Sequence, residues 1–131
     1  MNDRPSAVEL IDAVRGYLEK ELLPALTDAR LRFQTLVAAN VLSVAGRELA
    51  TEAEHLEEEW RLLDESLGQG EAAPKGTKEM RQAIERRNRG MCERIRGGEF
   101  DEPEPFSKLA ERLRRVVVRK LEVANPRYLG L

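Results

Sequence analysis

The only histidine in the chain, His55, lies three residues after Glu52. On a helix this spacing puts a carboxylate and an imidazole on one face, which is how di-iron helical bundles arrange their metal ligands. Such a site needs a second Glu-x-x-His pair, and this chain has no second histidine. No group of cysteine and histidine residues has the spacing of a zinc site either. We therefore predict no metal site.

The only cysteine, Cys92, could act as a nucleophile only with a histidine base close to it in the fold. Cys92 follows Met91 in one expected helix, whereas His55 lies on the acidic outer face of another. We therefore predict a half-buried structural thiol. The stretch GQGEAAPKG at 68–76 lacks the Gly-Lys-Ser/Thr ending of a phosphate-binding loop, and no strand precedes it. These motifs predict no catalytic residue and no cofactor.

Arginine is concentrated in two expected helices, at 77–96 and 106–124, where glutamates are interleaved with it. The sequence pI is about 5.6. A nucleic-acid-binding domain is usually strongly basic, so we predict no nucleic-acid partner. Residues 1–70 contain seven basic and fourteen acidic side chains, and residues 71–131 contain fifteen and ten. Two interpretations stay open: the halves neutralise each other within one fold, or the basic half meets an anionic partner.

Three polar residues fall inside otherwise apolar helical stripes: Asn40, Asn88 and Lys120. A buried amide without a hydrogen-bond partner costs about 1–3 kcal/mol, so we expect the asparagines to pair with each other or with a helix end in a polar core. Lys120 can extend beyond its stripe to solvent, to Glu48 or to an anionic ligand. The functional alternative is that the three residues line a small pocket between helices.

Helices must position all of these residues, because Ala, Leu, Glu and Arg dominate and strand-forming runs of Val, Ile, Thr and aromatic residues are missing. The stretch from Leu36 to Ala45 is apolar apart from Asn40 and Ser43. A helix that is apolar on nearly every side is normally buried. We therefore predict an all-α fold of about five helices, an antiparallel bundle around a buried central helix at about 29–49.

Local signals predict where these helices begin and end. Ser6 and Glu9 form a Ser-x-x-Glu capping box for a first helix, which Pro24 should end near Leu23. Asp28 can cap the central helix. A second capping box at Thr51 and Glu54 either restarts the central helix or continues it. The remaining signals are stops at Gly68 and Gly70, a cap at Thr77, stops at Gly97 and Gly98, and an end before Pro126.

The chain has 131 residues, the usual size of one domain. Neither side of the 68–76 loop holds enough apolar residues for a core of its own, so we predict a single domain at 1–131. No stretch reaches the roughly 20 apolar residues of a membrane span, and the start MNDRP leads into polar sequence, unlike a secretory signal. Together with the single cysteine, these features predict a cytoplasmic protein without membrane contact.

Four segments occur in a distinctive order: LRFQTLVAANVLSVAGREL (31–49), EEEWRLLDESLG (57–68), MCERIRGGEFD (91–101) and KLEVANPRYLGL (120–131). Together they resemble a bacterial helical domain family of unknown function. That family occurs alone or at the C-terminus of aminoglycoside-phosphotransferase-like kinases, and its genes are similar in setting to acyl-CoA dehydrogenase operons. One position departs from the family, which usually has a basic residue before VAAN, where this chain has Leu36.

The resemblance implies a helper protein of a kinase that acts on a small hydroxyl-bearing or CoA-linked metabolite. We therefore predict a non-enzymatic accessory or interaction module, whose partner is a phosphotransferase-like or acyl-CoA-metabolising enzyme. The alternative is a small-ligand-binding protein or weak enzyme for CoA-type or phosphorylated metabolites. A homodimer formed through Trp60 or the apolar C-terminal tail is also open. The predicted contact residues are cations or an amphipathic ring at the ends of elements: Arg32, Arg47, Arg96, Arg127 and Tyr128.

Overall fold

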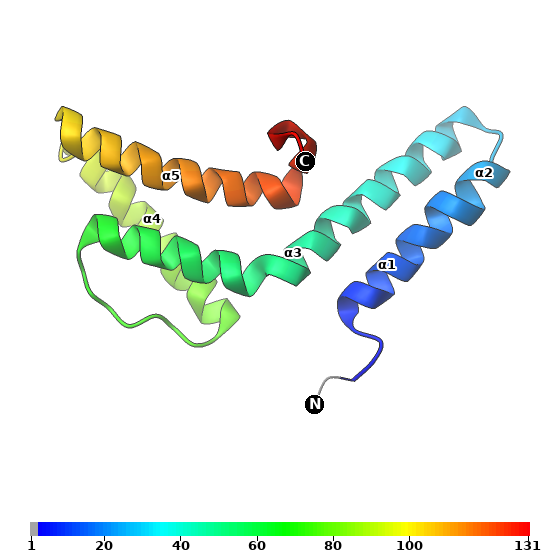
Figure 1. Ribbon diagram of the computed structural model, residues 1–131, viewed down its shortest axis with the longest axis horizontal. Helices are drawn as coiled ribbons and strands as arrows, with labels where there is room; N and C mark the ends of the chain where they lie inside the picture. Colours follow the sequence, from blue (N-terminus) through cyan, green and yellow to red (C-terminus); the bar gives the residue numbers. More distant parts are fainter. Residues whose placement is uncertain (1–2) are drawn as a thin grey trace. The chain divides into compact units, whose positions relative to one another are not determined.

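The computed structural model describes residues 3–131, and within them the chain is helical with no strand. The all-α prediction is confirmed. The helices, seen in Figure 1, are α1 (Ala7–Tyr17), the π-helical turn η1 (Leu18–Leu22), α2 (Leu23–Ala25), α3 (Ala29–Leu67), α4 (Thr77–Arg96), α5 (Pro103–Ala124) and the 3-10 turn η2 (Pro126–Leu129). None of the helices in this described part has the length and apolar character needed to cross a bilayer.

The first helix begins where the sequence predicts it. The Ser6 hydroxyl accepts the Glu9 backbone N–H at 3.2 Å, and a Glu9 carboxylate oxygen accepts the Ser6 N–H at 2.7 Å. The helical path continues past Leu23 and ends at Ala25, beyond the predicted limit. The wider π-helical turn η1 ends at Leu22, two residues before Pro24, which has no N–H to continue the hydrogen bonds of an α-helix interior and lies in the first turn of α2.

The helix α3 begins at its predicted cap, because Asp28 accepts the backbone N–H of Leu31 at 3.0 Å. It then runs without interruption to Leu67, so of the two alternatives for the Thr51–Glu54 signal, a restart or a continuation of the helix, the structure shows the continuation. The Thr51 hydroxyl donates to the Arg47 carbonyl at 2.8 Å, four residues earlier in the same helix. At α4, Gly76 takes the N-cap position that the sequence predicts for Thr77.

The chain divides into two compact units. We call the first the hairpin unit: Met1–Thr51 with Val123–Asn125. In it α1 runs beside the first half of α3 in the opposite direction (Figure 1). Ile11 of α1 lies close to Gly46 of α3. A Cβ atom added to Gly46 would lie 3.5 Å from the Cγ2 atom of Ile11.

The hairpin unit differs from the prediction of a buried central helix at 29–49. Only Ala39 and Gly46 are buried in this part of α3, whereas Phe33 is 67% exposed, Val41 59% and Leu36 51%. The physical reason is that one neighbouring helix can cover only one side of a helix that is apolar nearly all round. Apolar character therefore predicted the helix correctly and its burial incorrectly.

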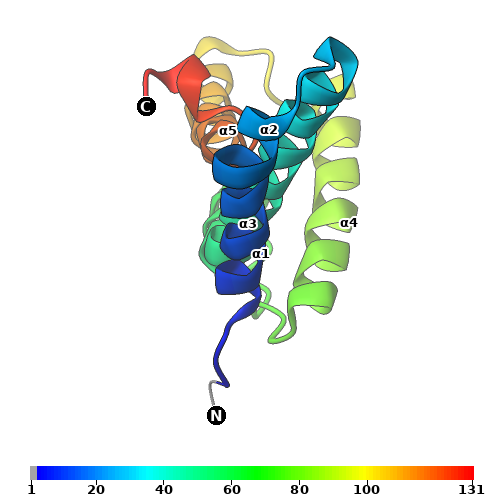
Figure 2. The same ribbon diagram turned by 90° about the vertical axis from the view of Figure 1, so that its right-hand side faces the viewer.

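We call the second the three-helix unit: Glu52–Glu122 with Pro126–Leu131. It contains the second half of α3, all of α4 and most of α5, and Figure 2 shows α4 along its whole length. Its apolar core takes residues from all three helices. The buried members are Trp60, Leu63, Leu67, Met80, Ala83, Ile84, Met91 and Leu109. The 1–131 single-domain prediction stays a prediction.

Candidate functional site

The three-helix unit has an open groove of about 580 Å³ between α3, α4 and α5. Leu56 of α3 and buried Ile84 of α4 contribute apolar surface to it. Polar and charged side chains supply the remaining lining. We call this site the α4–α5 groove, and its other lining residues are Glu59, Arg81, Glu85, Asn88, Arg89, Cys92, Glu93, Arg96 and Lys120.

Most charges around the α4–α5 groove are already paired. Lys120 Nζ lies 3.5 Å from Glu59 Oε1, and Arg89 lies 2.5 Å from Glu85. Arg81 pairs with Glu52 of α3. Arg96, by contrast, forms no ion pair with any residue in the described range 3–131. The groove therefore offers one guanidinium to an occupant without the loss of an internal partner.

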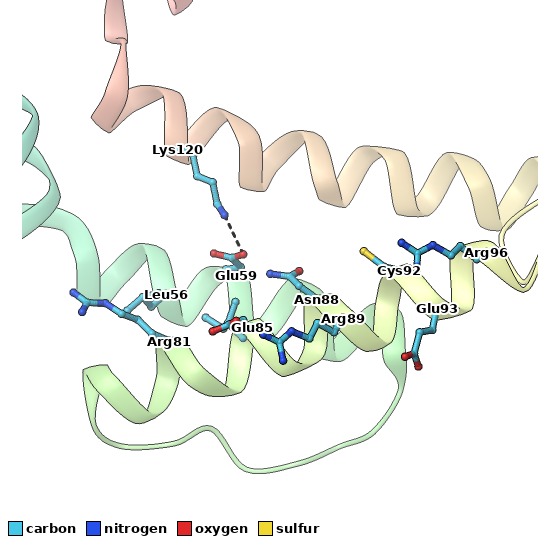
Figure 3. A pocket seen from close by; sticks show the side chains of 11 residues that line it. Leu56, Glu59, Arg81, Glu85, Asn88, Arg89, Cys92, Glu93, Arg96 and Lys120 are labelled. Atoms are coloured by element: carbon cyan, nitrogen blue, oxygen red, sulfur yellow. Dashed lines mark hydrogen bonds and ion pairs between the residues drawn. The ribbon is translucent and has the colours of Figure 1, made fainter.

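Asn88 and Lys120, which the sequence placed together as pocket residues, both line the α4–α5 groove. Figure 3 shows Lys120 reaching from α5 toward Glu59 on α3, while Asn88 and Cys92 project from α4 into the same space. Lys120 is exposed and Asn88 is half-buried. Lys120 thus extends to the surface, which was one of the alternatives for it, and it pairs with Glu59 instead of lying in a polar core.

Cys92 is exposed, so the predicted half-buried thiol is also wrong. The buried stripe of α4 contains Met80, Ile84 and Met91, and the next position after Met91 turns about 100° away from it. Consequently Cys92 faces the groove. No histidine lines this groove, and His55 instead lies with its Nε2 3.7 Å from Glu122 Oε2.

The acidic face of α3 is only partly at the surface, because Glu54 and Glu57 are exposed whereas Glu52, Glu58 and Glu59 are partly covered. The side chains of Glu58 and Glu59 are only 12% and 11% exposed. Glu58 accepts from Arg119 Nε at 2.8 Å and lies 3.5 Å from Arg115 Nη2. Hydrogen bonds from Arg119 to Glu122 and Glu58 raise the pKa of Arg119. The acidic and basic parts of the sequence therefore meet as ion pairs within one unit.

The predicted contact residues have different surroundings. Arg32 donates to the carbonyl oxygens of Leu23 and Leu26 at 2.7 and 2.9 Å, and so satisfies the end of α2. Arg47 Nε donates to the Val123 carbonyl at 2.8 Å, near the end of α5. Both guanidinium groups thus stabilise helix ends. The other three residues are exposed: Arg96, Arg127 and Tyr128.

Asn40 is exposed, so the predicted buried amide is wrong. Asn40 is exposed because the side of α3 that carries it has no neighbouring helix in the hairpin unit. Trp60 is only 7% exposed and belongs to the core of the three-helix unit. It therefore cannot supply the homodimer patch that the sequence suggested.

Sequence reasoning missed Arg87, a buried charged residue of α4 that is 5% exposed. Its guanidinium carbon lies 3.5 Å from the centroid of the Trp60 ring, and its Nη1 donates to Asp64 at 2.9 Å. The signal was present, since Arg87 continues the helical spacing of Met80, Ile84 and Met91. An arginine at a core position of a stripe indicates a cation–π or ion-pair role.

In chemical terms the α4–α5 groove is suited to binding. Its apolar patch can take an apolar group, and the cations around it can hold a carboxylate or phosphate. Within residues 3–131 no group of three or more His, Cys, Asp or Glu side chains is arranged to hold a metal ion.

Comparison with known proteins identifies one family. The family described as a domain of unknown function, DUF6285, matches residues 24–128. No curated protein and no solved structure matches the chain significantly. The matched range includes most of both units and every residue that lines the α4–α5 groove. The chain therefore belongs to the DUF6285 family.

Proposed function

We propose that the protein is a non-enzymatic cytoplasmic accessory module, which binds a partner protein in the α4–α5 groove. The partner is a phosphotransferase-like kinase or an enzyme of acyl-CoA metabolism. The resemblance of the four sequence segments supports this class of partner, and the single cysteine supports a reducing compartment.

The observation that carries the proposal is the combination of apolar surface and an unpaired cation in one open groove. An amphipathic helix of a partner can lay its apolar face over Leu56 and Ile84, which is a common mode of peptide recognition. A carboxylate on that helix can then pair with Arg96. Since Arg96 has no ion pair within residues 3–131, this contact displaces no internal carboxylate.

The experiment is size exclusion with light scattering, on the protein alone and mixed with the phosphotransferase-like protein encoded nearest to it. We expect a joint peak that Arg96→Glu weakens by tenfold or more, because charge reversal replaces an attraction by a repulsion. Arg114→Glu is the matched control, since Arg114 is an exposed arginine of the three-helix unit that does not line the groove. Far-UV circular dichroism checks that both variants are folded.

Two outcomes contradict the proposal. A mixture without a joint peak rejects this partner class, and equal weakening by Arg96→Glu and Arg114→Glu rejects the groove as the contact surface. Arg47→Glu is a poorer test, because it also breaks the hydrogen bond between Arg47 and Val123.

A second candidate function is binding of a CoA-type or phosphorylated metabolite, with weak enzymatic turnover as its extension. The size of the groove favours it, since about 580 Å³ lies within the roughly 300–1,000 Å³ of typical ligand pockets. Asn88 and Lys120 would then contact the ligand beside Arg96. These three side chains supply an amide, an ammonium and a guanidinium, which suit phosphate oxygens.

Thermal melting with CoA, acyl-CoA and ATP tests this second function. A ligand at about 100 times its dissociation constant adds about 2.7 kcal/mol to the free energy of unfolding. Arg96→Gln should reduce the shift in melting temperature, and Arg114→Gln should leave it unchanged. Unaltered melting with all three compounds would exclude them as ligands.

A further inference from the structure

Arg87 has an incompletely satisfied guanidinium in a buried position. The side chain is 5% exposed and lies against the face of Trp60. Its Nη1 atom has a good partner in Asp64 at 2.9 Å. Its Nη2 atom has a longer contact of 3.3 Å to Glu71, and its Nε atom is buried with no hydrogen-bond partner in residues 3–131.

The position of these atoms matters, because Nε and Nη2 form one edge of the guanidinium. Their two N–H groups point in parallel and match the two oxygens of a carboxylate or a phosphate. Glu71 occupies this edge with one oxygen only, at Nη2. The edge of Arg87 that is best shaped for a two-oxygen anion is therefore half used.

A small cavity of about 210 Å³ lies against Arg87. Arg87 and Trp60 line it together with Arg86 and Glu71. A water molecule takes about 30 Å³ of liquid volume, so the cavity can hold a phosphate group or a small carboxylic acid. Two arginines and one carboxylate, Glu71, line it. When Glu71 leaves, Asp64 remains as the ion-pair partner of Arg87, and the two arginines then have one positive charge in excess.

Glu71 is well placed to act as a replaceable occupant. Its side chain is 64% exposed, and it belongs to the connection between α3 and α4, outside any helix. An exposed carboxylate that leaves Arg87 regains its hydration, so its loss costs little. Asp64 stays on Nη1 and continues to neutralise part of the buried charge.

We propose that the Nε–Nη2 edge of Arg87 is a binding site for a small oxyanion, a phosphate group or a carboxylate. Glu71 occupies the site in the absence of ligand and leaves when the oxyanion binds Nε and Nη2 together. The site is separate from the α4–α5 groove, since the two cavities share no lining residue. It therefore stands or falls independently of the proposed function.

Trp60 makes the site directly measurable, because it is the only tryptophan in the chain and lies against Arg87. The experiment titrates the full chain with inorganic phosphate and, separately, with acetate, at constant ionic strength kept with sodium chloride. We expect a saturable change in Trp60 emission. NMR of the Arg87 Nε–Hε group supplies the second readout, since that proton gains a hydrogen bond on binding.

Removal of the internal competitor is the decisive variant. Glu71→Gln should tighten oxyanion binding about tenfold, the effect of one hydrogen bond to a charged group. Glu111→Gln is the matched control, because Glu111 is an exposed glutamate of α5 that does not line the cavity. Arg87→Lys keeps the charge and loses the two-donor edge, so binding should weaken about tenfold or more.

Each outcome decides between alternatives. Saturation by phosphate alone assigns the site to phosphoryl groups, and saturation by acetate alone or by both assigns it to carboxylates or to oxyanions in general. A response no greater than that of chloride overturns the proposal. The proposal is also overturned if Glu71→Gln binds phosphate and acetate no more tightly than the unaltered chain, whether or not Arg87→Lys folds.

Discussion

The hairpin unit and the three-helix unit contain similar helices but bury their apolar residues to very different extents. In the three-helix unit, eight residues from α3, α4 and α5 form one apolar core. In the hairpin unit the apolar residues of α3 lie mainly at its surface, and only Ala39 and Gly46 are buried there. The difference teaches that a core depends on how many helices cover an apolar helix, and not on its apolar content alone.

The two units also differ in how they use charge. In the three-helix unit Arg87, Arg119 and Lys120 each meet a carboxylate of α3, and Glu58 and Glu59 are nearly buried. In the hairpin unit Arg15 pairs with exposed Asp12 and Glu19 on its own helical stretch. Ion pairs between helices hold elements together, whereas pairs along one helix contribute only a few tenths of a kcal/mol.

The same substitution in both units is the strongest test of this comparison. Leu63→Ala should lower the free energy of unfolding by about 2–5 kcal/mol, because it leaves a cavity in the core. Leu36→Ala, at a residue that is 51% exposed, should cost about 0.5 kcal/mol or less. Urea denaturation followed by circular dichroism measures both. Equal losses would show that Leu36 is covered in solution and would break the comparison.

A matched pair of aspartate substitutions sharpens the contrast in charge. Asp64→Asn removes the negative charge next to buried Arg87 and keeps an oxygen acceptor there, and it should cost about 1–3 kcal/mol. Asp12→Asn removes an exposed partner of Arg15 and should cost about 0.5 kcal/mol or less. The midpoint of urea unfolding gives both values. A loss for Asp12→Asn as large as that for Asp64→Asn would contradict the difference between the units.

A helix cap should matter mainly within the hairpin unit. Ser6→Ala removes the side chain that accepts the Glu9 N–H, and should weaken α1 by about 1 kcal/mol. Hydrogen exchange of the backbone amides should become faster in α1 and stay unchanged in α4. Ser66→Ala is the control, because Ser66 lies inside α3 and caps no helix start. Faster exchange throughout the chain would indicate that the units unfold together.

The smallest expected effect is a pH dependence in the three-helix unit. A hydrogen bond from Arg94 lowers the pKa of Glu99. A carboxyl whose pKa is lowered by folding stabilises the protein above its unfolded pKa, and this contribution is lost as the pH falls through the folded value. The melting temperature of Glu99→Gln should lie slightly below that of the unaltered chain at pH 7, and the difference should vanish in acid.

Salt supplies the control for this prediction, since both side chains are at the surface. The difference at pH 7 should shrink at 1 M sodium chloride, where exposed charges are screened within about 3 Å. A difference that grows as the pH falls would have the wrong sign and would exclude the ion pair as its cause.

Local features of the fold could be predicted from the sequence, and burial could not. The Ser6–Glu9 box and the Asp28 cap depend on backbone groups three residues away, so a short stretch contains all the information. The exposure of Asn40 and Cys92 depends on which helices lie beside α3 and α4. The spacing of a single helix does not contain that information.

The candidate site was predictable to a similar degree. Asn88 and Lys120 could be placed in one pocket because both interrupt apolar stripes. Arg87 could have been recognised by its place in the α4 stripe, but the half-used edge beside Glu71 depends on a loop residue 16 positions away. Contacts of that kind arise from the path of the chain after the helices have packed.

The hydrogen bond between Arg47 and Val123 joins two residues that the ribosome synthesises at different times. The two residues are 76 positions apart, and Val123 belongs to the hairpin unit although it lies near the other end of the chain. At about 5–20 residues per second, a ribosome needs roughly 4–15 s to travel from one to the other. During that interval Arg47 of the nascent hairpin has no Val123 carbonyl to which its Nε–H can donate.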